Sequence, residues 1–278
     1  MGGGQIGFRL VPVQTHLQAF AVLPESQLTE LKRFTEHLAD LAGEVIRSSW
    51  AKPKLEVEIK SDGSPVTLAD KEAERVMRAA IKHTYPDHGI VGEEFGSEHE
   101  TREFCWVLDP IDGTKSFISR VPLFTTLVGL RYQQAPLVGL IDQPLLRERA
   151  VGDGRTATFN GQPTRVVASP LAQAVVLTTD VENIYRHHPR ADWRGLTAKA
   201  NFSRTWGDGY GHLMVAAGRA HVMADPIMNP WDLIPVIPVL RGAGAIVTAW
   251  DGSDAMAAGN ALVAAPGLHA EVLSYLRR

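Results

Sequence analysis

The sequence predicts an α/β fold built from two parts, and two patterns carry that prediction. In residues 24–168, amphipathic helices precede a run of strands joined by short turns, which is typical of an α+β arrangement. In residues 169–278, strands and helices alternate, as they do in α/β folds. No low-complexity linker separates the parts, so we expect a subdomain boundary near residues 168–172 and no tether. Residues 1–23 are expected to form an additional N-terminal arm.

The composition is that of an ordinary soluble chain and excludes several classes of partner. Of the 278 residues, 45% are hydrophobic and 21% are charged, which argues against disordered and fibrous proteins. The net charge of −3 gives no long-range attraction to nucleic acid or to anionic membranes. No apolar run approaches the ~18 residues of a membrane span. We therefore expect a small-molecule partner, with neither nucleic acid nor membrane involved.

The only cysteine, Cys105, excludes an internal disulfide and a thiolate metal cluster. Because it lies in a predicted strand between Phe104 and Trp106, we expect a packed thiol and not a nucleophile. Polar residues interrupt the apolar run before Ala19, which argues against a secretory signal. A cytoplasmic location fits both observations.

The expected elements follow from apolar periodicity and from Pro and Gly breaks. Apolar side chains three and four residues apart mark the first helix, and Thr67 is a natural N-cap for the second. The elements expected in the first part are helices 25–49 and 66–85, strands 57–60, 90–91 and 104–108, a meander of strands 124–132, 137–141 and 147–151, and a tight turn at 160–161. Those expected in the second part are strands 175–179, 220–224, 245–248 and 261–264 and helices 210–217, 231–241 and 268–276. Pro230 suits the start of its helix, and Pro238 is expected to kink it.

Four carboxylates lie where open α/β folds place ligands, after a strand or at the start of a helix. Asp109 and Asp112 end the predicted strand 104–108, although aspartates three residues apart are also common turn formers. Glu93 follows another strand, and Asp232 begins a helix. Without cysteine or a histidine pair, this set suits Mg²⁺ or Mn²⁺ and not Zn²⁺.

Magnesium sites of this type act on phosphate groups. Two such ions about 3.5 to 4 Å apart would clamp the attacking and leaving oxygens of an in-line displacement, so a phosphate ester is the expected substrate. Gly113 and Thr114, at a helix start directly after the aspartates, would offer backbone N–H groups to the phosphate. Asp70, three residues after Thr67, has a simpler explanation as the carboxylate of a capping box.

Three motifs in this order resemble the inositol monophosphatase family of Mg²⁺-dependent, lithium-sensitive phosphatases. They are Gly92-Glu93-Glu94, the stretch from Trp106 to Thr114, and Trp231-Asp232 followed by Gly242-Ala243-Gly244. The resemblance extends over roughly residues 28–276. It implies a layered αβαβα sandwich, shared with fructose-1,6-bisphosphatase, and usually a homodimer.

The resemblance also assigns roles residue by residue. It implies two or three Mg²⁺ ions, with Mn²⁺ as a possible substitute, and the implied metal ligands are Glu93, Asp109, the backbone carbonyl of Ile111, Asp112 and Asp232. Asp70 and Thr114 would orient and deprotonate the attacking water, which displaces the capping interpretation of Asp70, and Gly113 and Thr114 would hold the phosphate. Lys60 either helps to close a mobile loop over the site or is a solvated lysine.

The substrate must be sought outside the metal motif. The stretches Gly139–Pro144 and Trp206–Gly211 are similar to those of the histidinol-phosphate phosphatase branch of the family. Asp225 and Asp208 would then face the substrate, and Asn229 is a further candidate for the pocket, although Asp208 between two glycines also suits a turn. Extra carboxylates would favour the cationic histidinol phosphate over a neutral polyol. The alternatives are an inositol-1-phosphate or broad sugar or nucleotide monophosphatase of the same family, and a non-catalytic metal-binding regulatory protein.

Overall fold

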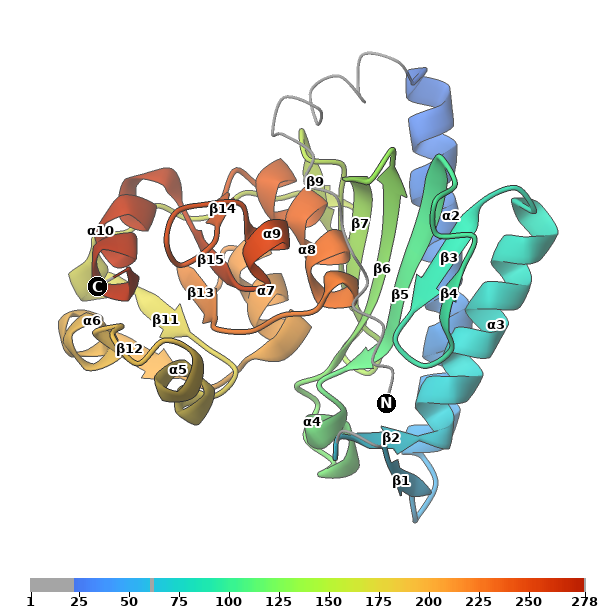
Figure 1. Ribbon diagram of the computed structural model, residues 1–278, viewed down its shortest axis with the longest axis horizontal. Coiled ribbons are helices and arrows are strands. Elements are labelled where there is room, and N and C mark those ends of the chain that lie inside the picture. The colour runs from blue at the N-terminus through green and yellow to red at the C-terminus, as the bar shows by residue number, and fades with distance from the viewer. Residues whose placement is uncertain (1–22, 61–62, 278) are drawn as a thin grey trace.

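Five layers of secondary structure, helices alternating with sheets, stack across the molecule (Figure 1). The computed structural model describes residues 23–60 and 63–277, so the predicted arm of residues 1–23 lies outside the description except for Leu23. The helices of these residues are α2 (Glu25–Trp50), α3 (Leu68–Thr84), α4 (Thr114–Ile118), α5 (Val181–His187), α6 (Trp193–Lys199), α7 (Asp208–Ala216), α8 (Pro230–Gly242), α9 (Ala255–Ala258) and α10 (Pro266–Leu276). The αβαβα sandwich implied by the resemblance is confirmed.

Within the described residues, the larger sheet has eight strands, which lie between residues 89 and 163. In spatial order these are β10 (Gln162–Pro163), β9 (Ala157–Phe159), β8 (Glu148–Gly152), β7 (Ala135–Gln143), β6 (Thr125–Tyr132), β5 (Phe104–Asp112), β3 (Gly89–Gly92) and β4 (Gly96–Glu98). The predicted meander is β6 to β8, and the turn at Asn160-Gly161 joins β9 to β10 with both residues at positive φ. Helices α2 and α3 cover one face, where Leu38 and Met77 pack in one cluster with Trp106 of β5.

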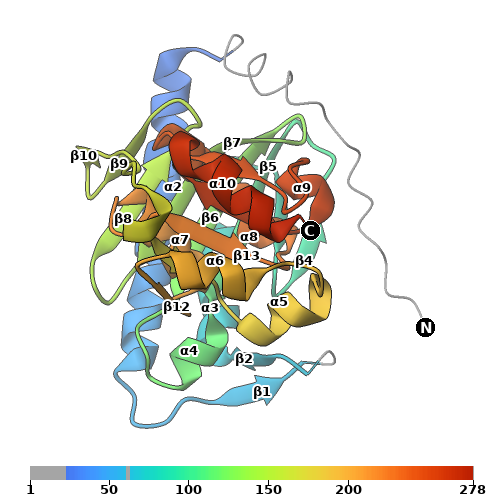
Figure 2. The same cartoon turned by 90° about the vertical axis from the view of Figure 1, so that its left-hand side faces the viewer.

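The smaller sheet has five strands and belongs to the second half of the chain. Its order is β12 (Phe202–Arg204), β11 (Val175–Leu177), β13 (Val222–Asp225), β15 (Ala261–Ala264) and β14 (Ile246–Thr248). Successive residues of β11 point to opposite faces, so Val175 and Leu177 pack toward α7 and α8, whereas Val176 packs under α10. Figure 2 views the molecule from the side of α10, with α5, α6 and α10 in the outer layer. Because α7 and α8 contact both sheets, the two halves share one core.

A row of glycines lets α8 lie directly on the larger sheet. Gly129, Gly139 and Gly152 are neighbours on β6, β7 and β8. A Cβ atom at Gly139 would overlap the carbonyl oxygen of Pro235, and one at Gly152 would meet the carbonyl oxygen of Pro238 at 2.7 Å. Helix α8 is continuous through Pro235 and Pro238, and the Pro238 carbonyl accepts a hydrogen bond from Gly154 N at 2.9 Å. The close approach of backbone to backbone therefore replaces side-chain packing here.

Several local predictions hold, and others need correction. Cys105 is fully buried, and burial raises the pKa of its thiol, as expected for a packed residue. The second helix starts at Leu68 and not at residue 66, because residues 65–67 form β2 (Pro65–Thr67), paired with β1 (Val57–Ile59). The short α5, α6 and β12 were not predicted, since the stretch 181–204 lacks a regular apolar period. None of the described helices is long and apolar enough to cross a membrane.

Candidate active site

The site is centred on the end of β5, where the strand bulges. The pairing register with β6 shifts between Asp109 and Asp112, because Pro110 between them has no N–H to donate to the ladder. The first turn of α8 brings Asp232 to the same place. Oxygen atoms of Asp109, Asp112 and Asp232 all lie within 4.8 Å of one another. The D-x-x-D stretch thus forms part of a carboxylate cluster and is not an ordinary turn.

The buried negative charges of the cluster favour the binding of a cation. Burial first, and then the neighbouring carboxylates, raise the pKa of Asp109 and of Asp112 well above the ordinary value. The same two causes raise the pKa of Asp232 to about 7. Asp109 is only 2% exposed, and its Oδ1 has no hydrogen-bond partner among the described residues. A bound divalent cation would supply the missing partner and offset the mutual repulsion, so the residues fit Mg²⁺.

Glu93 joins the cluster from the neighbouring strand. β3 runs parallel to β5, and Glu93 N donates to Leu108 O at 3.1 Å. After burial, the charge of Glu93 contributes most to the raised pKa of Asp109. Glu93 nevertheless lies outside the group formed by Asp109, Asp112 and Asp232. Lys60 Nζ contacts Glu93 Oε1 at 2.9 Å and Glu94 Oε1 at 2.8 Å. The alternative of a solvated lysine is therefore wrong, because Lys60 is an ion-pair partner of a metal-ligand candidate.

A buried glutamate that was not predicted fixes the turn that carries Glu93. Glu74 on α3 is fully buried, and its carboxylate accepts hydrogen bonds from Glu94 N at 2.8 Å and Phe95 N at 3.2 Å. Arg78 compensates its charge with an Nε to Oε1 distance of 2.7 Å. The only sequence signal was the four-residue spacing of Glu74 and Arg78, which also occurs on solvated helix faces.

Asp70 has two functions at once. Its Oδ2 accepts from Thr67 N at 2.8 Å in a complete capping box, while its Oδ1 lies 3.4 Å from Thr114 Oγ1. The expectation that a role beside Thr114 displaces capping is therefore wrong, since each carboxylate oxygen serves one purpose. Thr114 Oγ1 also donates to the Ile111 carbonyl at 3.1 Å. Burial raises the pKa of Asp70 to about 6, against the opposing hydrogen bonds from Thr67.

A left-handed glycine links the aspartates to α4. Gly113 has φ 88° and serves as the N-cap of this helix. A side chain there would be strained, and its Cβ would lie 2.9 Å from Asp208 Oδ2 and 3.0 Å from Leu123 O. The backbone N–H groups of the first helical turn have no intrahelical acceptor, and this turn follows Asp112 directly along the chain. Phosphate binding by Gly113 and Thr114 stays a prediction.

Next to the carboxylate cluster lies a small acidic pocket of about 60 Å³. Thr179 connects the Asp225 carboxylate to the backbone of Asp208, because Thr179 Oγ1 donates to Asp225 Oδ1 at 2.6 Å and accepts from Asp208 N at 2.8 Å. Burial and the charge of Asp225 raise the pKa of Asp208 to about 7. The lining residues are Asp112, Thr179, Asp180, Asn183, Asp208, Asp225, Pro226, Ile227, Met228 and Asp232.

Two residues that were not predicted line the pocket, and one predicted residue, Asn229, does not. Asp180 and Asn183 line it from the start of α5, a helix that was not predicted. His212 is fully buried, with Nε2 3.3 Å from Asp225 Oδ2, behind the pocket wall. Asn229 is exposed and does not line the pocket; it is the N-cap of α8, where its N–H donates to Asp232 Oδ2 at 2.7 Å.

Comparison with known proteins agrees with this arrangement. A model of the inositol monophosphatase family matches residues 27–278. The chain belongs to the inositol monophosphatase family. It is therefore a phosphoric monoester hydrolase of a family whose members generally use Mg²⁺.

Relatives within the inositol monophosphatase family carry more than one name. The chain is 39% identical over 231 residues to the bifunctional phosphatase IMPL2, chloroplastic, of Arabidopsis thaliana, a match that covers 81% of the chain and 66% of that protein. It is 38% identical to a histidinol-phosphatase of Chlorobaculum parvum, with coverage of 82% and 89%. An inositol-1-monophosphatase of Synechocystis is 33% identical, with coverage of 76% and 75%. Among solved structures, an inositol monophosphatase from Zymomonas mobilis superposes with a TM-score of 0.79 at 29% identity, covering 90% and 98% of the two chains.

Proposed function

We propose that this member of the inositol monophosphatase family hydrolyses L-histidinol phosphate to L-histidinol and phosphate, a step of histidine biosynthesis. The observation that carries the proposal is the acidic pocket beside the metal cluster. Asp180, Asp208 and Asp225 line it in addition to Asp112 and Asp232. Histidinol phosphate carries an ammonium group and an imidazole, which these carboxylates would attract, whereas a neutral polyol gains little from them. The histidinol-phosphatases among the relatives support the same choice.

The proposed mechanism assigns the metal ligands to Glu93, Asp109, the Ile111 carbonyl, Asp112 and Asp232. Mg²⁺ held there would neutralise charge on the phosphoryl group and make the attacking water more acidic. The N–H groups of Gly113 and Thr114 hold the phosphate oxygens and orient the phosphorus.

Thr114 and Asp70 supply the base in this proposal. Thr114 Oγ1 orients the attacking water and relays its proton to Asp70 Oδ1, which is 3.4 Å away. The new bond joins the water oxygen to phosphorus as the bond from phosphorus to the ester oxygen breaks. The alcohol leaves with a proton from solvent, the second water proton stays on the phosphate product, and Asp70 then releases its proton to solvent. The transition state needs mainly charge neutralisation and positioning, which this set of residues provides.

The test is phosphate release from three substrates under identical conditions. We expect the kcat/KM for histidinol phosphate to exceed the values for inositol 1-phosphate and 3′-phosphoadenosine 5′-phosphate. A higher kcat/KM for inositol 1-phosphate would favour the alternative of an inositol-1-phosphate phosphatase. The inositol-1-monophosphatase of Synechocystis among the relatives supports that alternative. Restored growth of a histidine-requiring strain that lacks its own histidinol-phosphatase provides an independent test.

Further properties belong to the same proposal. We expect two or three Mg²⁺ ions with Mn²⁺ as a substitute, inhibition by lithium, a homodimer and a cytoplasmic location. Activity against metal concentration, with and without LiCl, tests the first two. Light scattering coupled to size exclusion tests the dimer.

A further inference from the structure

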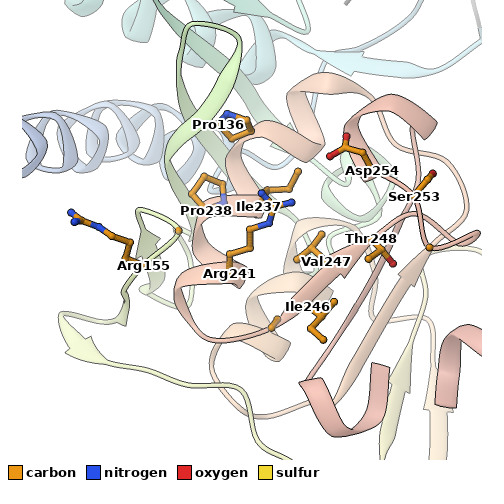
Figure 3. A pocket seen from close by; sticks show the side chains of 13 residues that line it. Pro136, Arg155, Ile237, Pro238, Arg241, Ile246, Val247, Thr248, Ser253 and Asp254 are labelled. Atoms are coloured by element: carbon orange, nitrogen blue, oxygen red, sulfur yellow. The ribbon is translucent and has the colours of Figure 1, made fainter. Parts of the chain in front are cut away.

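A second cavity, of about 540 Å³, lies beyond the other end of α8 (Figure 3). Its size falls within the range of small-molecule pockets, about 300 to 1,000 Å³. Its walls come from the second half of α8, from β14 and from the turn before α9. Asp232 and Arg241 are nine residues apart on α8, which places the cavity roughly 14 Å along the helix from the metal cluster. It therefore belongs to a different site.

The cavity contains a half-buried cation without a partner. Arg241 forms no hydrogen bond or ion pair within the part of the chain that the structure describes. Burial lowers the pKa of its guanidinium, and the charge of Asp254 only partly offsets this effect. Arg155 also lines the cavity, but Figure 3 shows its side chain turning away from Arg241, and it pairs with Glu25 at 3.2 Å. A guanidinium that has lost much of its water without gaining an acceptor is a binding group for an anion.

A carboxylate, Asp254, also lines the cavity but forms no ion pair with Arg241. Its Oδ1 accepts the capping hydrogen bond from Ala257 N at 3.0 Å, which holds the carboxylate in place and leaves Oδ2 for another donor. A ligand with only an anion would be repelled by Asp254, and one with only a cation would be repelled by Arg241.

The rest of the lining is apolar. Ile237, Pro238 and Val247 are buried beneath the opening, and Ile246 is 37% exposed at its edge. These side chains would bury the apolar body of a ligand whose two charges reach Arg241 and Asp254.

We propose that this cavity binds a free α-amino acid with an apolar or aromatic side chain. The carboxylate pairs with Arg241, the ammonium group pairs with Asp254, and the side chain lies on Ile237, Pro238 and Val247. The contacts on α8 connect the ligand to the helix that begins at the metal cluster.

Calorimetric titration of the whole protein with L-phenylalanine tests the proposal. N-acetyl-L-phenylalanine lacks the ammonium charge and L-phenylalaninamide lacks the carboxylate, so each is expected to bind at least about tenfold more weakly, because one charged side chain is left unpaired. The absence of phenylalanine binding, or equal binding of the three compounds, would overturn the proposal.

Three variants locate the binding. Arg241→Met and Asp254→Asn are expected to weaken phenylalanine binding about tenfold or more, and asparagine keeps the helix cap. Arg155→Met, on the same rim, should bind like the wild type, and all three variants should retain phosphatase activity. Unchanged binding by Arg241→Met contradicts the site. Loss of binding in Asp208→Asn also contradicts it, because the amino acid would then occupy the acidic pocket of the active site.

Discussion

The metal end and the substrate end of the active site are built by different parts of the chain. Glu93, Asp109 and Asp112 project from adjacent strands of the larger sheet. The acidic pocket is lined mainly by residues that follow β11 and β13 of the smaller sheet. Asp232 at the start of α8 belongs to both. In the function proposed above, the larger sheet therefore carries most of the metal ligands, and the smaller sheet carries the residues that select the substrate.

The largest effect is expected at the metal end. Asp112→Asn should reduce phosphate release on the order of 10³-fold for every substrate, because one metal ligand is lost from the catalytic centre. Asparagine can still accept the hydrogen bond from Gly209 N, so circular dichroism melting in EDTA should show a folded protein. Retained turnover would refute the metal assignment, whereas wild-type protein without turnover on any of the three substrates would support a non-catalytic protein.

A substitution in the acidic pocket should change the preference between substrates and not the catalytic step itself. Asp208 adopts φ 50°, a conformation that asparagine tolerates, so Asp208→Asn should fold normally. We expect the ratio of kcat/KM for histidinol phosphate to that for inositol 1-phosphate to fall about 10- to 100-fold. Using the ratio cancels any effect that Asp208 exerts on the metal cluster through its charge. An equal loss for both substrates would place Asp208 with the metal end.

The glycine row should couple the two ends, because α8 lies between them. Gly139→Ala is expected to lower the free energy of unfolding by about 1 to 3 kcal/mol, since the added Cβ overlaps Pro235 O. Activity should fall with it, as the shift of α8 displaces Asp232.

Gly267→Ala is the matched control for Gly139→Ala. Gly267 lies in α10 with no atom within 4 Å of the added Cβ, so the same substitution should stabilise by about 0.5 to 1 kcal/mol. Urea denaturation measures the free energy of unfolding of both variants. A neutral Gly139→Ala would show that α8 can adjust without cost.

The smallest effect is expected at Lys60, on the outer side of the metal end. Its ammonium group competes with the cation for Glu93, so Lys60→Met should lower the Mg²⁺ concentration for half-maximal activity by a factor of a few, in line with ~0.5 to 1 kcal/mol for a partly exposed pair. Lys71→Met removes an exposed pair with Glu58 and should leave this concentration unchanged. A higher Mg²⁺ requirement in Lys60→Met would mean that Lys60 instead holds Glu93 in position, and lower activity at saturating Mg²⁺ would support its role in loop closure.

Sequence patterns predicted the metal end far better than the substrate end, for a physical reason. Asp109, Asp112 and Asp232 each stand directly at the end of a strand or the start of a helix, so local periodicity locates them. Asp180 and Asn183 line the pocket, and His212 lies behind its wall, through contacts between segments far apart in the chain, which no local spacing encodes. Helix α5 lacked a regular apolar period because it is a seven-residue helix with a single buried side chain, Ile184.

Asp70 shows a different limit of sequence reasoning. Capping and a position beside Thr114 were treated as alternatives, yet the carboxylate has two oxygens and uses one for each. The same holds for Asp232, which accepts from Asn229 N while it contributes an oxygen to the cluster. A carboxylate has two oxygen atoms and can therefore serve two contacts, as Asp70 and Asp232 both do.

The row of Gly129, Gly139 and Gly152 has a consequence for engineering and for natural variation. These residues touch no ligand and contribute no side chain, yet they determine how near α8 can come to β5. A mutational scan scored for activity should therefore find intolerant positions in the middle of the larger sheet, away from every charged group. Redesign of the acidic pocket for another phosphate ester can change Asp208 or Asp180, but the spacing between sheet and helix has to be inherited unchanged.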